Sequence, residues 1–501
     1  MPLLSFVLLL LLFLVSGFGL LHFFGLRLKA AYTVSLSLLL GVALASFLPF
    51  LLQLFYIGLT GAAVFTSLAL AAVVLAIPAG ISLRKEGWAS FRRSLFPAPV
   101  RIYSYEVPFL MIIGFFVLVS VWRCYYLPPT SRDALSGPEA IAEIAVREHT
   151  MINSFFNVDL WSTNNQFKSP FLISLQLIYK LAGFPFGQIW LSIVFISFTV
   201  FLYNALKEKV HPLLAGLLLL IFFMTPEMYA YTFMILYDYS NMVYMFLGLY
   251  FLFGYFQNGL KGYFFFAGVL IGIATYIRSE TLALALLFLP PILLAQRRQK
   301  LPLKKAALAD VLFFIPSLIG YYLPTQLYIK HYLPVHYDVG GLINNHLTNL
   351  SPLFQRYSDI VTRLLVSEFA IHLWGYIFYL SFILFVAEAV LFRRFTRDAR
   401  NWLYAFAALY LGLGVLGWLL PMMNLNETTK RAMFKMLPVA IFYLANNQLL
   451  LRLSESITRW ENKPWGLGAS GKQPAPVQKA VLTKSGKTVA AGSDAARRRK
   501  R

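Results

Sequence analysis

The sequence predicts an all-α polytopic membrane protein, and three observations support this fold class. Of the 501 residues, 59% are hydrophobic and only 13% are charged, whereas about a quarter of the residues in a soluble domain carry charge. The apolar runs reach the roughly 20 residues that a helix needs to cross a hydrocarbon core. Because backbone groups in lipid must bond to one another, such long apolar runs predict a helical bundle and not a porin-type barrel.

The apolar runs predict about 13 transmembrane helices. They cover residues 3–24, 32–54, 60–82, 107–126, 188–206, 212–225, 239–256, 262–276, 281–296, 308–328, 366–392, 402–420 and 436–451. The first run lacks a basic segment before it, so we interpret it as a retained span and not as a cleaved signal peptide.

Four regions follow from this division of the chain. Residues 1–106 hold three N-terminal helices and a cytoplasmic loop, and residues 107–296 hold the core with the external loop 128–187. Residues 297–452 hold the remaining helices with a second external loop at 329–364. Residues 453–501 form a basic tail that is too polar to bury a core, and we expect it to be disordered.

Basic residues alternate between loops and thereby assign each loop to one side of the membrane. One set of loops carries Arg27, Lys29, Arg84, Lys85, Arg92, Arg93, Arg101, Lys207, Lys209, Lys261, Arg297, Arg298, Lys300, Lys304, Lys305, Arg393, Arg394, Arg397 and Arg400. The opposite set, at 128–187, 226–238, 278, 329–364 and 421–435, carries few. Since cytoplasmic loops are enriched in Lys and Arg, we expect the first set and the tail in the cytoplasm. This bias accounts for the net charge of +22, so nucleic acid is not expected as a partner.

The polar stretch 128–187 is where we expect chemistry, because it gathers charge in a chain that has little. It contains Arg132, Asp133, Glu139, Glu143, Arg147, Glu148, His149, Asp159 and Lys168. Residues 137–151 predict a helix that begins at Pro138 and carries an apolar stripe. Residues 169–181 are apolar but too short to span. We expect both helices to lie on the membrane surface.

Three features between about Val107 and Pro291 resemble a known superfamily. The first is Asp133 after a span, followed by surface helices and the turn Lys168-Ser169-Pro170-Phe171, which opens an apolar helix ending at Gly183. The second is Met224-Thr225-Pro226 followed by Tyr237-Asp238. The third is the small-residue helix Ala267–Ile277, which ends in the basic Arg278. Together they resemble the GT-C membrane glycosyltransferases, particularly the bacterial branches that glycosylate proteins and lipids.

The resemblance implies transfer of a sugar from a polyprenyl-phosphate donor to an acceptor at the extracytoplasmic face of a bacterial inner membrane. The acceptor would be a glycolipid, a lipid-linked glycan or a protein, and no cofactor would be required. Membrane lipids would be the other partners. The chain departs from the family pattern in having a lone Asp133 where an Asp-Glu pair is usual, and Lys168 where His is common.

Two carboxylates are the candidate catalytic residues. Asp133 lies close to a predicted span end, where it can take the proton from an acceptor hydroxyl. The alternative is that it caps the helix near Pro138 or pairs with Arg132. Asp238, at the mouth of a span, can position the acceptor, bind a divalent ion together with Asp133, or cap the next helix.

Basic residues outside the cytoplasmic loops are candidates for the donor phosphate. Arg278 stands at an abrupt turn between two spans, where a guanidinium can contact a phosphate in a bidentate manner. The alternative is an ion pair with Glu280. Lys430, Arg431 and Lys435 form an external basic cluster that can stabilise charge on the leaving phosphate, with contact to anionic headgroups as the alternative. We assign Lys168, Glu280 and Glu139 to substrate binding.

The 329–364 loop carries His331, His336, Asp338, His346, Arg356 and Asp359. The histidine spacings match no compact zinc motif, so we interpret the loop as a mobile cover over the substrate, aided by Gly340 and Gly341. No metal site is predicted, although a divalent ion remains an alternative.

Three other functions are consistent with parts of the pattern. A transporter or lipid-linked-oligosaccharide flippase would place ionisable residues within its spans and would often show inverted repeats, whereas here the polar residues collect in external loops. A surface-polysaccharide polymerase or ligase would share the long external loop but would not need an acid at Asp133. A membrane scaffold without catalytic function is the third alternative.

Overall fold

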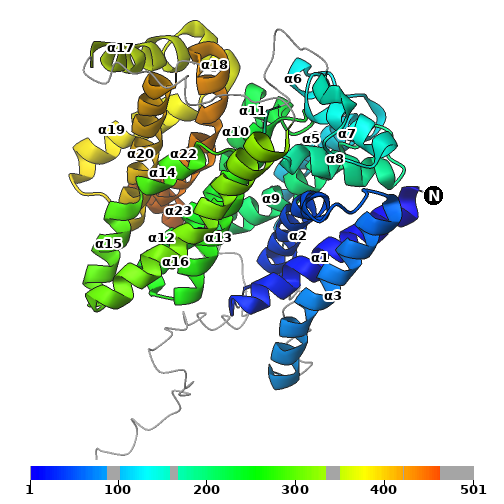
Figure 1. Ribbon diagram of the computed structural model, residues 1–501. Helices are drawn as coiled ribbons and strands as arrows, with labels where there is room; N and C mark the ends of the chain where they lie inside the picture. Colours follow the sequence, from blue (N-terminus) through cyan, green and yellow to red (C-terminus); the bar gives the residue numbers. More distant parts are fainter. Residues whose placement is uncertain are drawn as a thin grey trace, which may run out of the picture. The chain divides into compact units, whose positions relative to one another are not determined.

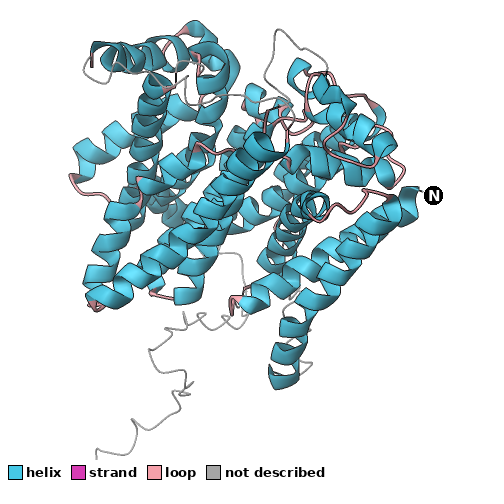
Figure 2. Cartoon of the chain, in the orientation of Figure 1, coloured by secondary structure: helices cyan, strands magenta, loops and turns pink. Residues whose placement is uncertain are grey.

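A computed structural model of the chain describes residues 2–26, 28–86, 102–157, 167–333, 350–420 and 423–462. All regular secondary structure in these ranges is helical (Figure 2), which confirms the predicted all-α class. The chain divides into a large unit, Met1–Thr458, and a small unit, Arg459–Arg501. Everything described below belongs to the large unit, apart from the last residues of its final helix.

Eight helical segments within the described ranges are long and apolar enough to cross a membrane, or up to ten if each of two bent pairs is one span. The eight are α1 (Pro2–Phe23), α2 (Ala30–Leu54), α3 (Gly61–Glu86, apolar to Ile81), Ser104–Tyr126 with α5 (Val107–Tyr126), α9 (Ile189–Lys207), Thr281–Arg298 with α14 (Thr281–Leu286) and α15 (Leu289–Arg298), Leu303–Tyr332 with α16 (Leu303–Tyr322) and the π-helical η3 (Leu323–Tyr332), and α20 (Arg397–Leu419). The chain is therefore a multi-pass membrane protein.

The two bent pairs coincide with the predicted spans 366–392 and 436–451. The first joins α18 (Glu368–Trp374) to α19 (Ile377–Phe392) at 102°, and the second joins Leu425–Asn446, which ends with α22 (Met436–Asn446), to α23 (Gln448–Glu461) at 55°. The three remaining predicted spans fall on α10 (Pro212–Phe223), α12 (Tyr237–Asn258) and α13 (Lys261–Ile277). Since α10 has 12 residues and rises only about 18 Å, the count of 13 stays a prediction.

The three N-terminal helices form a tightly packed group that docks on the core. A Cβ at Gly17 of α1 would overlap the backbone of Ser37 in α2, and one at Gly19 would overlap Leu75 in α3. Only glycine permits such close backbone contact. The group joins the rest of the unit through α2, which contacts α8 (Phe171–Leu181) and α9.

Two glycines of the small-residue helix α13 have a packing role against α16. A Cβ at Gly268 would lie 2.6 Å from the Phe313 carbonyl oxygen, and one at Gly272 would lie 2.6 Å from Pro316. On its other side α13 packs along α12. The small residues therefore bring α12, α13 and α16 together in the centre of the unit, and this arrangement fixes the position of Arg278 at the end of α13.

The polar stretch folds as α6 (Arg132–Leu135), α7 (Pro138–Glu148), the 3-10 turn Ser154–Asn157 and α8. Helices were predicted at 137–151 and 169–181, and both are present. However, α8 does not lie on a lipid surface, because every side chain from Phe171 to Tyr179 is buried by protein. The apolar stripe of α7, which includes Ile141 and Ala145, is buried too, and α7 packs on α8.

The remaining elements complete the unit. They are the 3-10 turn Ser104–Glu106, α11 (Pro226–Ala230), α17 (Ser351–Asp359), the π-helical η5 (Ile360–Leu365), the π-helical η6 (Leu425–Thr429), α21 (Lys430–Ala432) and the 3-10 turn η7 (Met433–Lys435). Figure 1 shows α6, α7, α17 and α18 at one end of the unit and the lower end of α15 at the other. Of the helices at this end, α6, α7 and α17 belong to segments that the charge pattern predicts to be external, whereas α18 begins a predicted span.

Several predictions concern residues outside the described ranges. They are the sidedness of Arg27, Arg92, Arg93 and Arg101, the roles of Asp159, His336, Asp338, Gly340, Gly341 and His346, and the disorder of the basic tail from residue 463 onward.

Candidate functional site

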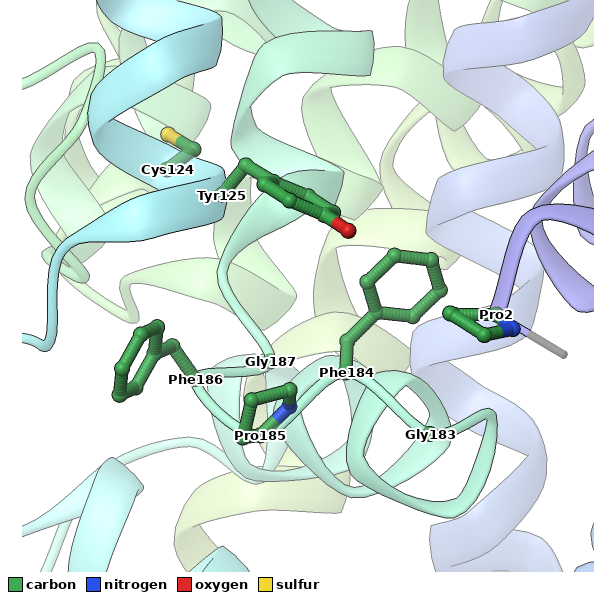
Figure 3. A pocket seen from close by; sticks show the side chains of 8 residues that line it. All are labelled: Pro2, Cys124, Tyr125, Gly183, Phe184, Pro185, Phe186 and Gly187. Atoms are coloured by element: carbon green, nitrogen blue, oxygen red, sulfur yellow. The ribbon is translucent and has the colours of Figure 1, made fainter.

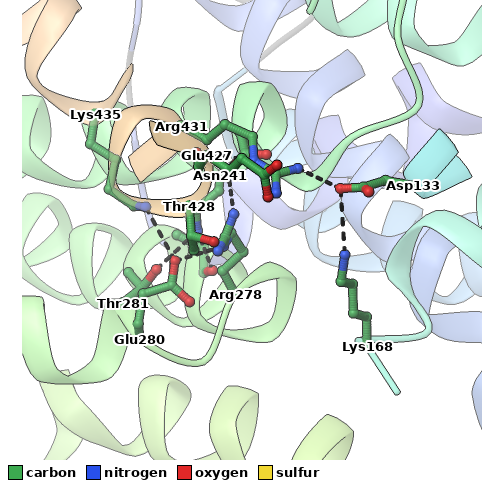
Figure 4. A network of polar contacts seen from close by, with 12 residues as sticks. Asp133, Lys168, Asn241, Arg278, Glu280, Thr281, Glu427, Thr428, Arg431 and Lys435 are labelled. Carbon is green, nitrogen blue, oxygen red and sulfur yellow. Dashed lines mark hydrogen bonds and ion pairs between the residues drawn. The ribbon is translucent and has the colours of Figure 1, made fainter. Parts of the chain in front are cut away.

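Seven ionisable side chains from five segments meet at the end of the unit that holds α6 (Figure 4). We call this group the charged cluster. It consists of Asp133 of α6, Lys168 before α8, Asp238 of α12, Arg278 and Glu280 of the turn after α13, and Arg431 and Lys435 of α21 and η7. Six of the seven are site residues predicted from the sequence, and Lys435 belongs to the predicted external basic cluster.

Asp133 stands in the first turn of α6, between two cations. The Ser131 side chain caps this helix by accepting a hydrogen bond from Ala134 N at 3.1 Å. Arg431 Nη1 donates to Asp133 Oδ2 at 2.5 Å, and Lys168 Nζ lies 3.9 Å from the same oxygen. The N-cap of α7 is Gly137, so the alternative that Asp133 caps this helix is wrong.

Lys168 lies where the chain turns into α8 and faces the cluster. Its ammonium is 5.9 Å from the centre of the Tyr237 ring, and the Tyr237 hydroxyl donates to the Ser169 carbonyl at 2.7 Å. These contacts join the start of α8 to the start of α12. Burial lowers the pKa of the Lys168 ammonium to about 8, although Asp133 acts in the opposite direction.

Arg278 is held between two carboxylates. It pairs with Asp238 in the first turn of α12, and its Nε lies 2.6 Å from Glu280 Oε1. The Arg278–Glu280 ion pair that we considered as an alternative is therefore present. Asp238 is not the cap of α12, because the N-cap is Leu236. Lys435 Nζ lies 3.5 Å from Glu280 and extends the chain of charges toward η7.

An amide and a hydroxyl that the sequence did not single out hold this turn in place. Asn241 of α12 donates from Nδ2 to the Ala274 carbonyl at 2.6 Å and to the Thr281 hydroxyl at 2.9 Å. Both Asn241 and Thr281 are fully buried. Asn241 follows Asp238 by three residues, so one face of α12 supplies both the carboxylate for Arg278 and the amide that fixes its turn.

The charged cluster is buried enough for its net charge to matter. The exposed fraction is 2% for the Asp238 and Lys435 side chains, 13% for Glu280 and 17% for Arg431. Counted over the residues that the structure describes, the cluster holds four cations and three carboxylates, which gives it one net positive charge. Excess buried charge is costly unless it is paired, and this excess favours an anionic ligand. A phosphate would supply the missing negative charge.

Two predicted site residues lie in ion pairs outside the cluster. Lys430, the neighbour of Arg431, pairs with Glu227 of α11 at 2.6 Å. Glu139 of α7 pairs with Lys180 of α8 at 2.7 Å and also accepts a hydrogen bond from Gln176 at 2.5 Å. Glu139 therefore fastens α7 to α8, and its predicted contact with substrate has no support in this geometry.

The described residues contain no group of three or more His, Cys, Asp or Glu side chains that could hold a metal ion. Three of the residues named in the zinc alternative, His336, Asp338 and His346, lie outside the described ranges. Of the carboxylates proposed to share a divalent ion, Asp133 pairs with Arg431 and Asp238 pairs with Arg278.

A small cavity lies elsewhere, between the start of α1, the end of α5 and the loop that follows α8 (Figure 3). Its volume is about 120 Å³, and its lining consists of Pro2, Cys124, Tyr125, Gly183, Phe184, Pro185, Phe186 and Gly187. No carboxylate or basic side chain is among them. This cavity therefore offers apolar contact and no group for proton transfer at neutral pH.

Comparison with known proteins adds no family to this geometry. No family model matches the chain, and neither a curated protein nor a solved structure matches it.

Proposed function

We propose that the protein is an inverting membrane glycosyltransferase that moves a sugar from a polyprenyl-phosphate donor to an acceptor hydroxyl. The observation that carries the proposal is the charged cluster itself. It joins Asp133 to cations from segments as far apart in sequence as residues 168 and 431, at the end of the unit where the predicted external segments gather. A carboxylate beside several cations suits a reaction that needs a base and releases a phosphate.

The proposed step is a single displacement at the anomeric carbon. Asp133 accepts the proton of the acceptor hydroxyl, whose oxygen forms the new bond to the anomeric carbon. The bond from that carbon to the phosphate oxygen breaks, and its electron pair stays on the polyprenyl phosphate. The products are the glycosylated acceptor, the polyprenyl phosphate and a protonated Asp133, which returns its proton to water. No cofactor enters this balance.

Arg431 links the base to the leaving group in this proposal. In the structure it pairs with Asp133 and occupies Oδ2 of the carboxylate. A donor phosphate next to Arg431 would compete for the guanidinium and leave Asp133 to the acceptor. Arg278 is already paired with Asp238 and Glu280, so Asp238 serves to hold Arg278 and need not touch the reacting atoms.

The proposed setting is the inner membrane of a bacterium, with the charged cluster at the extracytoplasmic face and the C-terminus in the cytoplasm. The alternation of basic loops supports this orientation. The acceptor is a glycolipid, a lipid-linked glycan or a protein. An excess of cations at a membrane surface favours a lipid-linked phosphate as the donor over a neutral glycolipid.

One buried carboxylate bears on the transporter alternative. Glu388 of α19 is fully buried and accepts hydrogen bonds from Tyr443 at 3.0 Å and from Asn447 at 2.7 Å. It also accepts from Gln448 N at 3.2 Å, at the start of α23. An ionisable residue within a span is a mark of transporters, but two side-chain donors and the first backbone N–H of α23 account for Glu388 as a structural group.

Sugar transfer by the purified protein tests the proposal. Wild type and Asp133→Asn, both shown to be folded by thermal melting, are offered radiolabelled polyprenyl-phosphate sugars together with a membrane extract as acceptor. Transfer by wild type alone supports the function and the base. Equal transfer by both variants removes Asp133 as the base. If wild type transfers no sugar from any donor, the proposal fails, and movement of a fluorescent lipid across liposomes tests the flippase alternative.

A further inference from the structure

The segment that carries Arg431 is fastened from outside the charged cluster by α17. Arg356 of α17 donates from Nη2 to the carbonyl oxygen of Met423 and to the hydroxyl of Thr429. These two acceptors stand at the two ends of the turn that precedes Lys430 and Arg431. One guanidinium nitrogen therefore closes the turn, in addition to the 3.3 Å bond from the Thr429 hydroxyl to Met423.

The turn that Arg356 closes has an irregular backbone. Residues Leu425–Thr429 are π-helical, a conformation that occurs rarely and often near functional sites. The Asn424 side chain caps the segment by accepting from Glu427 N at 2.9 Å and from Thr428 N at 3.2 Å. Arg431 follows directly and donates from Nε to the Glu427 carbonyl at 3.3 Å. A change in this turn would therefore move Arg431 relative to Asp133.

Two glycines of α20 allow α17 to come close enough for this contact. A Cβ at Gly417 would lie 2.6 Å from Arg356 Nε, and a Cβ at Gly414 would overlap the Tyr357 ring. Gly414 and Gly417 are three residues apart and so share a face of α20. Tyr357 is held there as well, because its hydroxyl donates to the Leu411 carbonyl at 2.6 Å.

Among the described residues, Arg356 has no carboxylate as an ion-pair partner. Carboxylates do lie at ion-pair distance from the neighbouring cations: Arg278 has two, and Lys430, Arg431 and Lys435 have one each. Burial lowers the pKa of Arg356 from its usual value, and its Nε is buried without an acceptor. Arg356 Nη2 donates twice to the Met423–Thr429 turn. Stabilisation of this turn explains why the guanidinium lies there.

We infer that Arg356 is a positioning residue: it ties α17 to the Met423–Thr429 turn and thereby sets where Arg431 stands relative to Asp133. This inference deepens the proposed function and rests on it for the consequence in catalysis. Through this tie, the order of α17 and the Arg431–Asp133 ion pair are coupled. A substrate that displaces α17 would loosen the turn, and a substrate that draws Arg431 away from Asp133 would pull on α17.

Hydrogen exchange of the purified protein tests the tie without reference to activity. The informative variants are Arg356→Ala and Thr429→Val, which remove the donor and one acceptor, and Thr429→Ser, which restores the hydroxyl. The matched control is Tyr357→Phe, which removes a neighbouring hydrogen bond of α17. We expect faster exchange at residues 423–435 in Arg356→Ala and Thr429→Val, and wild-type exchange in Thr429→Ser and Tyr357→Phe. Unchanged exchange at 423–435 in both Arg356→Ala and Thr429→Val overturns the inference.

Transfer kinetics then test the consequence for the site. We expect Arg356→Ala and Thr429→Val to raise the KM for a polyprenyl-phosphate sugar by roughly three- to tenfold, in the range of couplings through a contact network. The KM for the acceptor should stay at the wild-type value, and Thr429→Ser should restore the donor KM. An equal rise in both KM values contradicts a role through Arg431. If wild type shows no transfer, the proposed function fails while the exchange result on the tie still stands.

Discussion

Two networks of charged residues lie at the same end of the molecule, and their difference separates a structural clamp from a site. Between α7 and α8, Lys180 is 6% exposed and meets Glu139 at 2.7 Å and Glu143 at 2.9 Å. Gln176 and Trp190 complete this network through hydrogen bonds. Lys180 and the exposed Arg147, which pairs with Glu143 at 3.0 Å, balance the two carboxylates there, and these four residues belong to the neighbouring helices α7 and α8. In the charged cluster the cations outnumber the carboxylates, and its seven members come from five segments.

Two properties of a charged network distinguish a structural clamp from a binding site: its net charge, and whether its members come from neighbouring helices or from distant segments. The clamp satisfies Lys180 fully, because the ammonium also donates to the Pro185 carbonyl at 2.8 Å. Among the described residues, the charged cluster holds one more cation than carboxylates, and its side chains are between 2% and 34% exposed. A polar group that is buried and incompletely compensated is a candidate for ligand binding, whereas a compensated one holds helices together.

The largest effect is expected for Asp133→Asn, which separates a base from a structural acid. The amide keeps the shape of the side chain but cannot take a proton, so we expect sugar transfer to fall by about 10²- to 10⁴-fold. The melting temperature should stay close to wild type, because Arg431 can still donate to the amide oxygen. If Asp133→Asn lowered the stability of the protein but left its turnover unchanged, Asp133 would be a structural residue and not the base.

Breaking the clamp should give the opposite pattern. Lys180→Met leaves Glu139 without its cation and leaves Glu143 with the exposed Arg147 alone, and removal of one partner from a buried pair costs about 3–5 kcal/mol of stability. We expect a lower melting temperature with an unchanged donor KM in the protein that remains folded. If the donor KM rose while the melting temperature stayed constant, Glu139 and its partners would be substrate-binding residues.

The pH dependence of donor binding should report on Lys168. Its pKa of about 8 means that the ammonium is charged below this pH and neutral above it, so affinity for a phosphate should fall as the pH rises through about 8. In Lys168→Arg the side chain keeps its charge through this range. We expect this variant to lose the alkaline decline, as measured by donor KM between pH 6 and about 9. The same decline in both proteins would show that Lys168 does not face the phosphate.

The smallest effect is expected at Lys430, although the sequence places it beside Arg431. Its charge is offset by Glu227, and the two side chains are 17% and 22% exposed. We expect Lys430→Met to raise the donor KM by less than about fivefold, or roughly 1 kcal/mol. Arg431→Met should raise it far more, and equal effects of the two variants would place Lys430 in the site as well.

Much of the fold could be predicted from the apolar runs. Unpaired backbone groups and charged side chains have a high free energy in lipid, so a segment that crosses the membrane must be apolar and helical. Every predicted span falls on a helix or a bent helix pair. The number that cross could not be fixed, since α10 and α13 are apolar but short. The burial of α8 was also missed. An apolar helix too short to span can lie on lipid or beneath another helix, and its sequence is the same in both cases.

The members of the site could be predicted better than their partners. Asp133, Lys168, Arg278 and Arg431 were recognised because charge is rare in this chain and stands out in predicted external segments. Their pairing depends on tertiary structure, as the sequence separation of 298 positions between Asp133 and Arg431 shows. The ion pair of Glu139 could not be predicted for the same reason: its partner Lys180 lies at the far end of α8, and only packing of the two helices brings them together.

Binding of undecaprenyl phosphate to the purified protein in detergent is the measurement that tests the central claim most directly. Undecaprenol, which lacks the phosphate, is the control ligand, and Arg431→Met and Lys180→Met are the matched variants. The account predicts that wild type and folded Lys180→Met bind the phosphate in preference to the alcohol, and that Arg431→Met loses this preference. Equal binding of the two lipids by wild type, or an unchanged preference in Arg431→Met, would contradict the assignment of the charged cluster to a lipid phosphate.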